Sequence, residues 1–268
     1  MQFSRFTRNV LRAFTSFGFA FLYLPLLVVA VLSFNTSRSF SWPPEGLTTS
    51  WWSKAVQSSE VRKALGQSVQ TAVVASLLAL VLGTMASFAV QRFRFFGRET
   101  VSFLVILPIA LPGIVTGIAL NRAFRSLGFS MGFFTLVVAH ATFCIVVVYN
   151  NVIARLRRLS PNLEEASADL GANTFQTFRY VTFPMVRSAL LAGGLLAFAL
   201  SFDEIVVTTF TSGPGMQTLP QWIFNNMFRP NNLPLVNVVA TVVVLLSIIP
   251  VWFAQRLSEG ASPVGNHS

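Results

Sequence analysis

Long apolar stretches separated by polar segments constrain the fold of this chain more than any other feature. A helix needs about 20 predominantly apolar residues to cross the hydrocarbon core of a bilayer. The stretches that meet this requirement lie at residues 13–34, 66–90, 101–120, 132–152, 188–210 and 235–253. We therefore expect an all-α membrane protein with six transmembrane helices, in which residues 1–268 form a single transmembrane domain.

The overall composition agrees with a protein that crosses the membrane several times. Hydrophobic residues make up 53% of the chain and charged residues 10%, and the mean hydropathy is +0.65, which argues against an ordinary soluble domain. The first apolar stretch follows Arg5, Arg8 and Arg12 and has no small-x-small cleavage site before its end. It is also longer than the apolar core of a signal peptide, so we expect a retained transmembrane helix.

The basic residues are distributed unevenly between the two sides of the predicted membrane. Of the 19 lysines and arginines, 12 lie on the side of the termini. The seven on the opposite side are Arg38, Lys54, Arg62, Lys63, Arg122, Arg125 and Arg229. Because cytoplasmic loops are enriched in lysine and arginine, both termini are expected in the cytoplasm. Orientation then explains the formal charge of +10, and no nucleic-acid partner is expected.

The third apolar stretch contains residues that interrupt helices, namely Pro108, Pro112, Gly113 and Gly117. Proline removes a helical hydrogen bond. Such breaks are tolerated at membrane depth where neighbouring helices or a water-lined cavity satisfy the freed backbone groups. Two interpretations stay open, a broken helix that lines a pathway and an ordinary kink for packing.

The chain lacks the motif that would bind ATP. A phosphate-binding loop has the form G-x-x-x-x-G-K-[ST], but neither Lys54 nor Lys63 follows a glycine, so ATP is expected on another polypeptide. His140 and His267 have too few nearby ligands for a metal site. We expect His140 to be an interhelical hydrogen-bonding residue, with proton relay as the alternative. The single cysteine, Cys144, is expected to be a small packing residue.

The polar segment 160–184 begins with signals for a short helix. Ser160 can cap the helix, Pro161 suits its first position, and glutamates lie in its early turns. Gly171 provides a stop, because glycine adopts the backbone conformation that ends helices.

A second short helix is predicted directly after this glycine. Asn173 followed by Gln176 is typical of a capping box, and Pro184 is expected to close the helix. The segment is therefore predicted to form two short helices joined at a glycine elbow.

The same segment contains a motif with fixed spacing. Glu165-Ala166-Ser167 is followed after three residues by Gly171, and after nine more by Val181-x-Phe183-Pro184. This resembles the EAA loop of bacterial ABC-importer permeases, Glu-Ala-Ala, three residues, Gly, nine residues, Ile-x-Leu-Pro, with Ser167, Val181 and Phe183 as substitutions. The resemblance implies a type I ABC-importer permease fold whose cytoplasmic loop docks on a separate ATPase subunit and transmits its motion; the alternative is an ordinary surface helix. The residues it assigns to coupling are Glu164, Glu165, Ala166, Asp169 and Gly171.

Two adjacent carboxylates, Asp203 and Glu204, lie in the fifth apolar stretch. Asp203 is fifteen residues beyond Ser188, or about 22 Å along a helix, in the outer half of the bilayer core. A carboxylate at that depth usually faces a polar cavity or a partner. Because adjacent helical residues point about 100° apart, we expect one to face a pathway and the other to bond neighbouring helices. They either attract a cationic substrate or act as structural anchors, such as ion pairs with Arg122 or Arg125.

Two aromatic residues are weaker candidates for the pathway. Tyr149 lies at the end of the fourth stretch, and Trp222 lies in the segment before the sixth. Aromatic faces can hold amine cations, although anchoring at the membrane interface is the alternative role.

Further stretches are similar to the polyamine (spermidine/putrescine) branch of ABC permeases, and specifically to the second of its two membrane subunits. They include residues 171–179, 181–184, 195–198, 201–204 and 218–220, and the pattern of prolines and glycines at 108–117. The similarity runs from about Trp51 to Arg256. The chain departs from that branch at Gly113, where an acidic residue is frequent, and at Gln67-Ser68, where Asn-Ser is frequent. Permeases for aminophosphonate, iron or thiamine share the framework and are the alternatives.

The resemblance implies a subunit of an ATP-driven polyamine importer in the bacterial inner membrane, and not an enzyme. A second, similar permease would complete the pathway, two ATPase copies would bind ATP and Mg²⁺, and an external binding protein would deliver the substrate. Lipid would surround the helices. The competing class is an ion-gradient-driven secondary transporter, in which His140, Asp203 and Glu204 would carry coupling ions.

Overall fold

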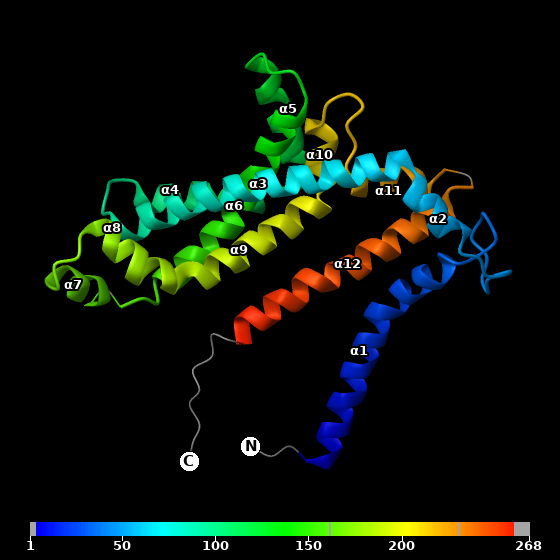
Figure 1. Ribbon diagram of the computed structural model, residues 1–268, viewed down its shortest axis with the longest axis horizontal. Coiled ribbons are helices and arrows are strands. Elements are labelled where there is room, and N and C mark those ends of the chain that lie inside the picture. The colour runs from blue at the N-terminus through cyan, green and yellow to red at the C-terminus, as the bar shows by residue number, and fades with distance from the viewer. Residues whose placement is uncertain (1–3, 161, 230, 260–268) are drawn as a thin grey trace. The chain divides into compact units, whose positions relative to one another are not determined.

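Helices dominate the computed structural model, which describes residues 4–160, 162–229 and 231–259 (Figure 1). Within these ranges no extended strand occurs, and one antiparallel bridge pairs Asn35 with Leu47. The chain divides into two units. One comprises the residues up to Arg62 together with Trp222–Ile249, and the other comprises Lys63–Gln221 together with the residues from Pro250. The predicted all-helical class is confirmed, whereas Pro161 and His267 lie outside the described residues.

The first unit contains α1 (Arg5–Leu32), α2 (Ser50–Gln57) and most of α11 (Leu219–Met227) and α12 (Leu233–Glu259). α1 begins before the predicted apolar stretch because the Ser4 hydroxyl accepts a hydrogen bond from the Thr7 N–H at 3.1 Å and caps the helix. The segment after α1 is held by the Trp51 indole, which donates to the Asn35 carbonyl at 3.0 Å.

The second unit contains the remaining helices, and with them the polar segment 160–184 and the carboxylates Asp203 and Glu204. They are α3 (Ser59–Arg92, which begins in the first unit), α4 (Arg98–Ala110), α5 (Gly113–Ser126), α6 (Phe133–Leu156), α7 (Asn162–Asp169), α8 (Thr174–Thr177), the π-helical turn η1 (Phe178–Thr182), α9 (Phe183–Asp203) and α10 (Val206–Thr211). α6 is the central helix of this unit, because it packs against α9, α4 and α10 and supplies most of the buried core.

Small residues let α3 approach α6 closely. A Cβ added to Gly83 would lie 2.9 Å from the Ile145 carbonyl oxygen and 3.0 Å from Val148 Cβ, so only glycine fits there. One turn later, the Ser87 hydroxyl lies 3.2 Å from the Tyr149 carbonyl oxygen. Close backbone contact at small residues is typical of helix pairs in membranes.

The described residues contain four helices that are long and apolar enough to cross a membrane: α1, α3, α6 and the continuous helix Thr174–Asp203. α4 and α5 form a pair bent by 109°, which gives a fifth crossing if the pair is one span. The third stretch is thus interrupted, with the break at Leu111–Pro112, and a role for this break in lining a pathway stays a prediction. In α12, Leu233–Ile248 is a shorter apolar helix. The chain is a multi-pass membrane protein, and the count of six spans stays a prediction.

Candidate functional site

The predicted glycine elbow is present between α7 and α8. Gly171 has φ +83°, a left-handed conformation that side chains rarely adopt. Its N–H donates to the Ala168 carbonyl at 2.9 Å, and the Ala172 N–H donates to the Ser167 carbonyl at 3.1 Å. These two bonds form a Schellman motif, which satisfies the last carbonyls of α7 and turns the chain into the next helix.

The predicted capping box at the start of α8 is also present. The Asn173 side chain accepts from the Gln176 N–H at 2.9 Å, and the Gln176 side chain accepts from the Asn173 N–H at 2.8 Å. The hydroxyls of Ser167 and Thr177, 3.0 Å apart, join the two short helices. The segment therefore has a defined structure of its own.

The prediction that Pro184 closes the second helix is wrong. The helix runs without interruption from Thr174 to Asp203. Before the proline the helix widens into the π turn η1, where the Phe183 N–H bonds the Phe178 carbonyl five residues back. A π turn relieves the clash between a proline ring and the carbonyl four residues earlier. The loop is consequently continuous with the fifth span.

Glu164 attaches α7 to two other helices. Its carboxylate forms an ion pair with Arg92 in the last turn of α3, and it accepts a hydrogen bond of 2.6 Å from the Thr182 hydroxyl in η1. In Figure 1, α7 and α8 lie at the same end of the second unit as the α3–α4 connection. Of the predicted coupling residues, Glu164 therefore faces inward as a tether.

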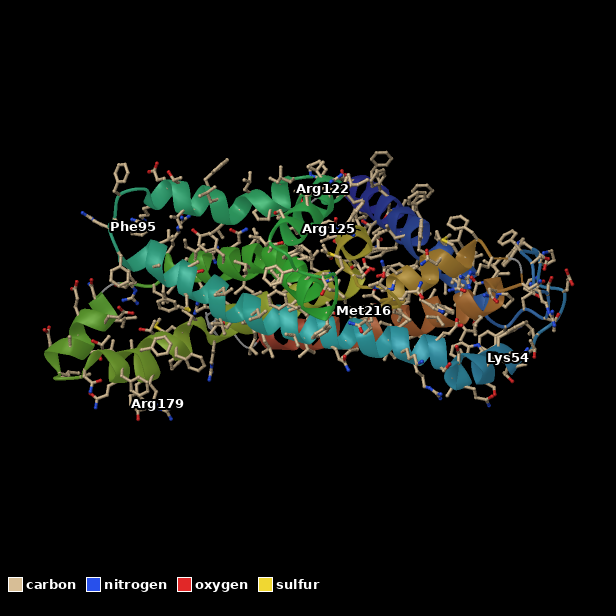
Figure 2. All side chains as sticks on the ribbon, turned by 90° about the horizontal axis from the view of Figure 1, so that it is seen from above. Lys54, Phe95, Arg122, Arg125, Arg179 and Met216 are labelled. Carbon is tan, nitrogen blue, oxygen red and sulfur yellow. The ribbon has the colours of Figure 1, made fainter. Side chains whose placement is uncertain are left out.

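The other predicted coupling residues face outward. Glu165, Ala166, Asp169 and Gly171 are all exposed. Two large apolar side chains are exposed beside them, Leu170 at 90% and Phe175 at 70%. Figure 2 shows Arg179 and Phe95 at this end of the unit, whereas Arg122 and Arg125 lie on α5 away from it. An exposed surface that mixes apolar and acidic groups is suited to contact with another protein.

The chain matches the family model described as "Binding-protein-dependent transport system inner membrane component" over residues 76–262. It belongs to this family. The matched range includes the tethered loop and the helices on both sides of it. As a permease of this family the chain is a transporter subunit and not an enzyme, and the secondary-transporter alternative is set aside.

Curated relatives of this permease carry names of polyamine transport systems. The putrescine transport system permease protein PotI of Escherichia coli (strain K12) is 36% identical over 234 residues, covering 84% of this chain and 82% of PotI. The spermidine/putrescine transport system permease protein PotC of the same strain is 34% identical over 242 residues, covering 90% of each chain. PotC of Haemophilus influenzae is 33% identical over 255 residues, covering 95% of this chain and 97% of PotC.

Solved structures share the fold of this permease. A chain of a bacterial ABC transporter involved in the import of the acidic polysaccharide alginate matches with a TM-score of 0.73 at 17% identity, covering 98% of this chain and 100% of that one. In a complex of the alginate transporter with an alginate pentasaccharide-bound periplasmic protein, a chain matches with a TM-score of 0.68 at 13% identity, covering 97% and 96%. The fold is therefore that of ABC-importer permeases, as predicted.

In this permease the two carboxylates do not lie on one continuous helix, so the 100° rotation between them that the sequence suggested does not apply. α9 ends at Asp203, Glu204 is extended at φ −72° and ψ 123°, and α10 begins at Val206. The Glu204 carboxylate accepts from the Val207 N–H at 2.8 Å and so caps α10. The Asp203 side chain is exposed at the end of α9.

The structural-anchor interpretation of these carboxylates is only partly correct. Glu204 does anchor a helix start, but its partner is backbone and not an arginine. Within the described residues neither carboxylate forms an ion pair with Arg122 or Arg125; the Arg125 Nε instead donates to Asn121. Asp203 therefore presents a carboxylate that no described basic side chain pairs.

Tyr149 and Trp222 are enclosed by protein. Each is 2% exposed. The Tyr149 hydroxyl donates to the Ser102 hydroxyl at 3.0 Å and so links α6 to α4. The Trp222 indole N–H lies 3.5 Å from a Glu60 carboxylate oxygen in the first unit. Their burial gives no support to the expectation that they line a pathway.

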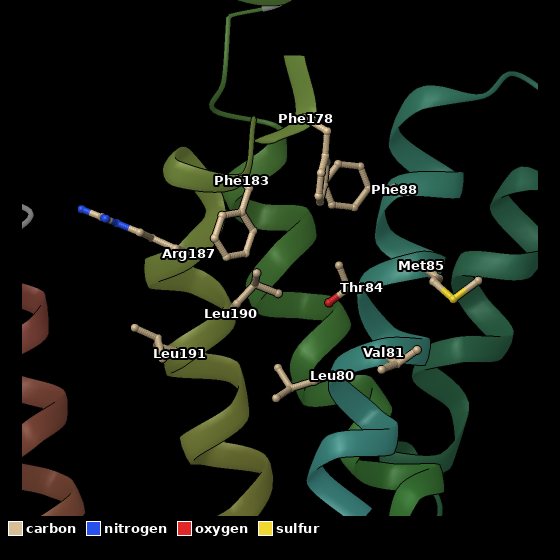
Figure 3. A pocket seen from close by; sticks show the side chains of 10 residues that line it. All are labelled: Leu80, Val81, Thr84, Met85, Phe88, Phe178, Phe183, Arg187, Leu190 and Leu191. Atoms are coloured by element: carbon tan, nitrogen blue, oxygen red, sulfur yellow. The ribbon is translucent and has the colours of Figure 1, made fainter. Parts of the chain in front are cut away.

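A groove of about 800 Å³ lies between α3 and α9 near the loop (Figure 3). Its walls are apolar, with Leu80, Met85 and Phe88 from α3 opposite Leu190 from α9. Arg187 lies at its edge, with the guanidinium directed away from it in Figure 3. Apolar walls beside a positive charge are unsuited to a cationic solute.

Proposed function

We propose that this permease forms half of the pathway of an ATP-driven importer for polyamines of the putrescine and spermidine type. The observation that carries the proposal is the 33–36% identity to PotI and PotC over most of the chain. A second, similar permease would form the other half, and an external binding protein would deliver the substrate. Two copies of an ABC ATPase would bind ATP and Mg²⁺.

The loop is proposed to be the contact with the ATPase. Glu165, Ala166, Asp169 and Leu170 supply an exposed surface, and Gly171 sets the angle between its helices. A push on this surface would reach α3 through the Glu164 tether. It would reach the carboxylates through the helix Thr174–Asp203, whose 30 residues span about 45 Å at ~1.5 Å per residue.

The proposed orientation places the loop and both termini in the cytoplasm of a bacterium, with the chain in the inner membrane. It rests on the excess of arginine on the side of the termini. The arginines at positions 155, 157, 158 and 187 flank the loop, Arg179 lies in it, and those at positions 92, 94 and 98 lie in or next to the α3–α4 connection on the same predicted side.

Asp203 and Glu204 are proposed to guide the cation. Asp203 is exposed at the C-terminus of α9. The C-terminus is the negative end of the helix dipole, which adds to the attraction for a cation. A polyamine carries several positive charges along an apolar chain, so complementary charge at the helix break favours its entry.

The substrate class is tested by titrating the cognate external binding protein against putrescine, spermidine and an aminophosphonate. The proposal expects saturable binding of the polyamines and none of the aminophosphonate. The reverse preference would reassign the importer to another substrate and leave the permease family membership intact. Iron and thiamine serve as further competitors in the same assay.

A further inference from the structure

One buried imidazole spans the interruption between α9 and α10. His140, on α6, has no exposed surface. Its Nδ1 lies 2.8 Å from the Ser201 hydroxyl in the last turn of α9, and its Nε2 lies 2.8 Å from the Thr208 hydroxyl in α10. The prediction of an interhelical hydrogen-bonding histidine is correct, but the sequence did not indicate that its two partners lie on opposite sides of a break.

The hydrogen bonds around this ring have a direction. The Thr208 hydroxyl donates its only proton to the Glu204 carbonyl at 2.8 Å. It can therefore only accept from the ring, so Nε2 carries the proton. A neutral imidazole has a single N–H, which leaves Nδ1 as the acceptor of the Ser201 hydroxyl. The chain of donors runs from Ser201 through His140 and Thr208 to the backbone of Glu204.

This network fixes both the backbone and the side chain of Glu204. Its carbonyl receives the Thr208 proton, and its carboxylate receives the Val207 N–H. Asp203 precedes it directly, at the last position of α9. No proline or glycine occurs between Ser201 and Thr208, so neither of the usual helix-breaking residues causes the interruption. The side chains of Glu204 and Thr208 form hydrogen bonds with backbone groups at the break and so compensate for the helical bonds lost there.

We propose that His140 is a positioning residue. Through Ser201 and Thr208 it sets the geometry of the helix break and thereby the placement of Asp203 and Glu204 in the pathway. The inference rests on the proposed function, because it assigns those carboxylates to cation transport. His140 itself does not touch the substrate.

The test uses the complete importer with its partner subunits and binding protein in liposomes, and measures putrescine taken up per ATP hydrolysed. The amide of glutamine reaches the place of Nε2 and can donate to Thr208, whereas the amide of asparagine reaches only the place of Nδ1. His140→Gln is therefore expected to keep uptake within about threefold of the wild type. His140→Asn and His140→Leu are expected to lower it by about tenfold, equivalent to about 1.4 kcal/mol.

A matched control is Thr142→Val on the same helix, because the Thr142 hydroxyl bonds only the Ala139 carbonyl of α6. This variant is expected to behave as the wild type. If His140→Leu fails to assemble, uptake by His140→Gln is compared with uptake by His140→Asn. Equal uptake by these two variants contradicts the inference.

A second measurement follows the break itself. In a Cys144→Ala background, which removes the single cysteine, spin labels at Leu196 on α9 and Thr209 on α10 report the distance across the break; both positions are exposed. His140→Leu is expected to broaden this distance distribution, and Thr142→Val is not. An unchanged distribution in His140→Leu overturns the inference.

The two proposals fail in different ways. If the carboxylates have no role in the pathway, neutralising both leaves uptake unchanged while His140→Leu still broadens the distance. If His140 does not position them, neutralising the carboxylates lowers uptake while His140→Leu changes neither the distance nor the uptake per ATP.

Discussion

Arg92 in the last turn of α3 forms an ion pair with Glu164 in the first turn of α7, 72 positions later in the chain. The same carboxylate accepts a hydrogen bond from Thr182. One side chain thus joins the loop to the second span and to the start of the fifth. A loop held at both sides can transmit force to two helices, whereas an untethered loop would absorb it.

Removing this tether should weaken coupling more than it weakens folding. Glu164→Ala should lower ATP-driven uptake more than Arg92→Gln. It removes both the ion pair with Arg92 and the hydrogen bond from Thr182, whereas Arg92→Gln removes the ion pair alone. The ion pair is partly exposed and contributes about 0.2–1 kcal/mol, whereas a hydrogen bond to a charged group contributes about 1.5–3 kcal/mol. Arg94→Gln is the control, since Arg94 forms no ion pair with a described carboxylate. Equal uptake in all three variants would contradict a role for the tether.

Substitutions at Gly171 should reduce transport in a graded order. No atom lies within 4 Å of an added Cβ, so the effect acts through the backbone alone. Asparagine tolerates the left-handed conformation, alanine costs about 1–2 kcal/mol, and proline cannot adopt it and lacks the N–H that bonds Ala168. Uptake should fall from Gly171→Asn through Gly171→Ala to Gly171→Pro, with unchanged membrane insertion measured by fractionation. Normal uptake in Gly171→Pro would refute the coupling role.

Neutralising the two carboxylates should lower cation uptake without disassembling the importer. Asp203→Asn with Glu204→Gln keeps the size of both side chains, and glutamine still offers an oxygen to the Val207 N–H. Uptake of putrescine should fall by about tenfold, equivalent to about 1.4 kcal/mol, while the amount of assembled complex stays the same. Unchanged uptake would make the pair structural only.

The close contact of α3 with α6 should not tolerate a larger residue at Gly83. An alanine there meets the Ile145 carbonyl and Val148, and overpacking of this kind costs about 1–3 kcal/mol. Gly66→Ala on the same helix is the control, because nothing lies within 4 Å of its added Cβ. Thermal unfolding in detergent should show a lower midpoint for Gly83→Ala only, and equal midpoints would contradict the packing.

The parts of the loop that the sequence predicted correctly depend on short-range chemistry. The side chains of Asn173 and Gln176 each accept a hydrogen bond from the other's backbone N–H. Gly171 lies two residues after Asp169, the last residue of α7. Such partners lie close in sequence, so residue type and spacing reveal them.

The parts that the sequence did not predict depend on residues far apart in the chain. The partner of Glu164 is a distant arginine, and the break after Asp203 is held by a histidine of another helix. The uninterrupted helix through Pro184 requires a π turn, which leaves no residue signature of its own. One available signal was missed: an acidic residue directly before the run Ile205–Thr208 is suited to capping a new helix.

This chain is proposed to couple a transport pathway to ATP that partner subunits hydrolyse. This coupling is tested by putrescine uptake into liposomes that contain the permease pair and the external binding protein, with and without the ATPase subunits, measured before and after ionophores have dissipated all ion gradients. Uptake is expected to require both ATP and the ATPase and to persist without a gradient. Uptake by the permeases alone, driven by an ion gradient, would contradict this proposal.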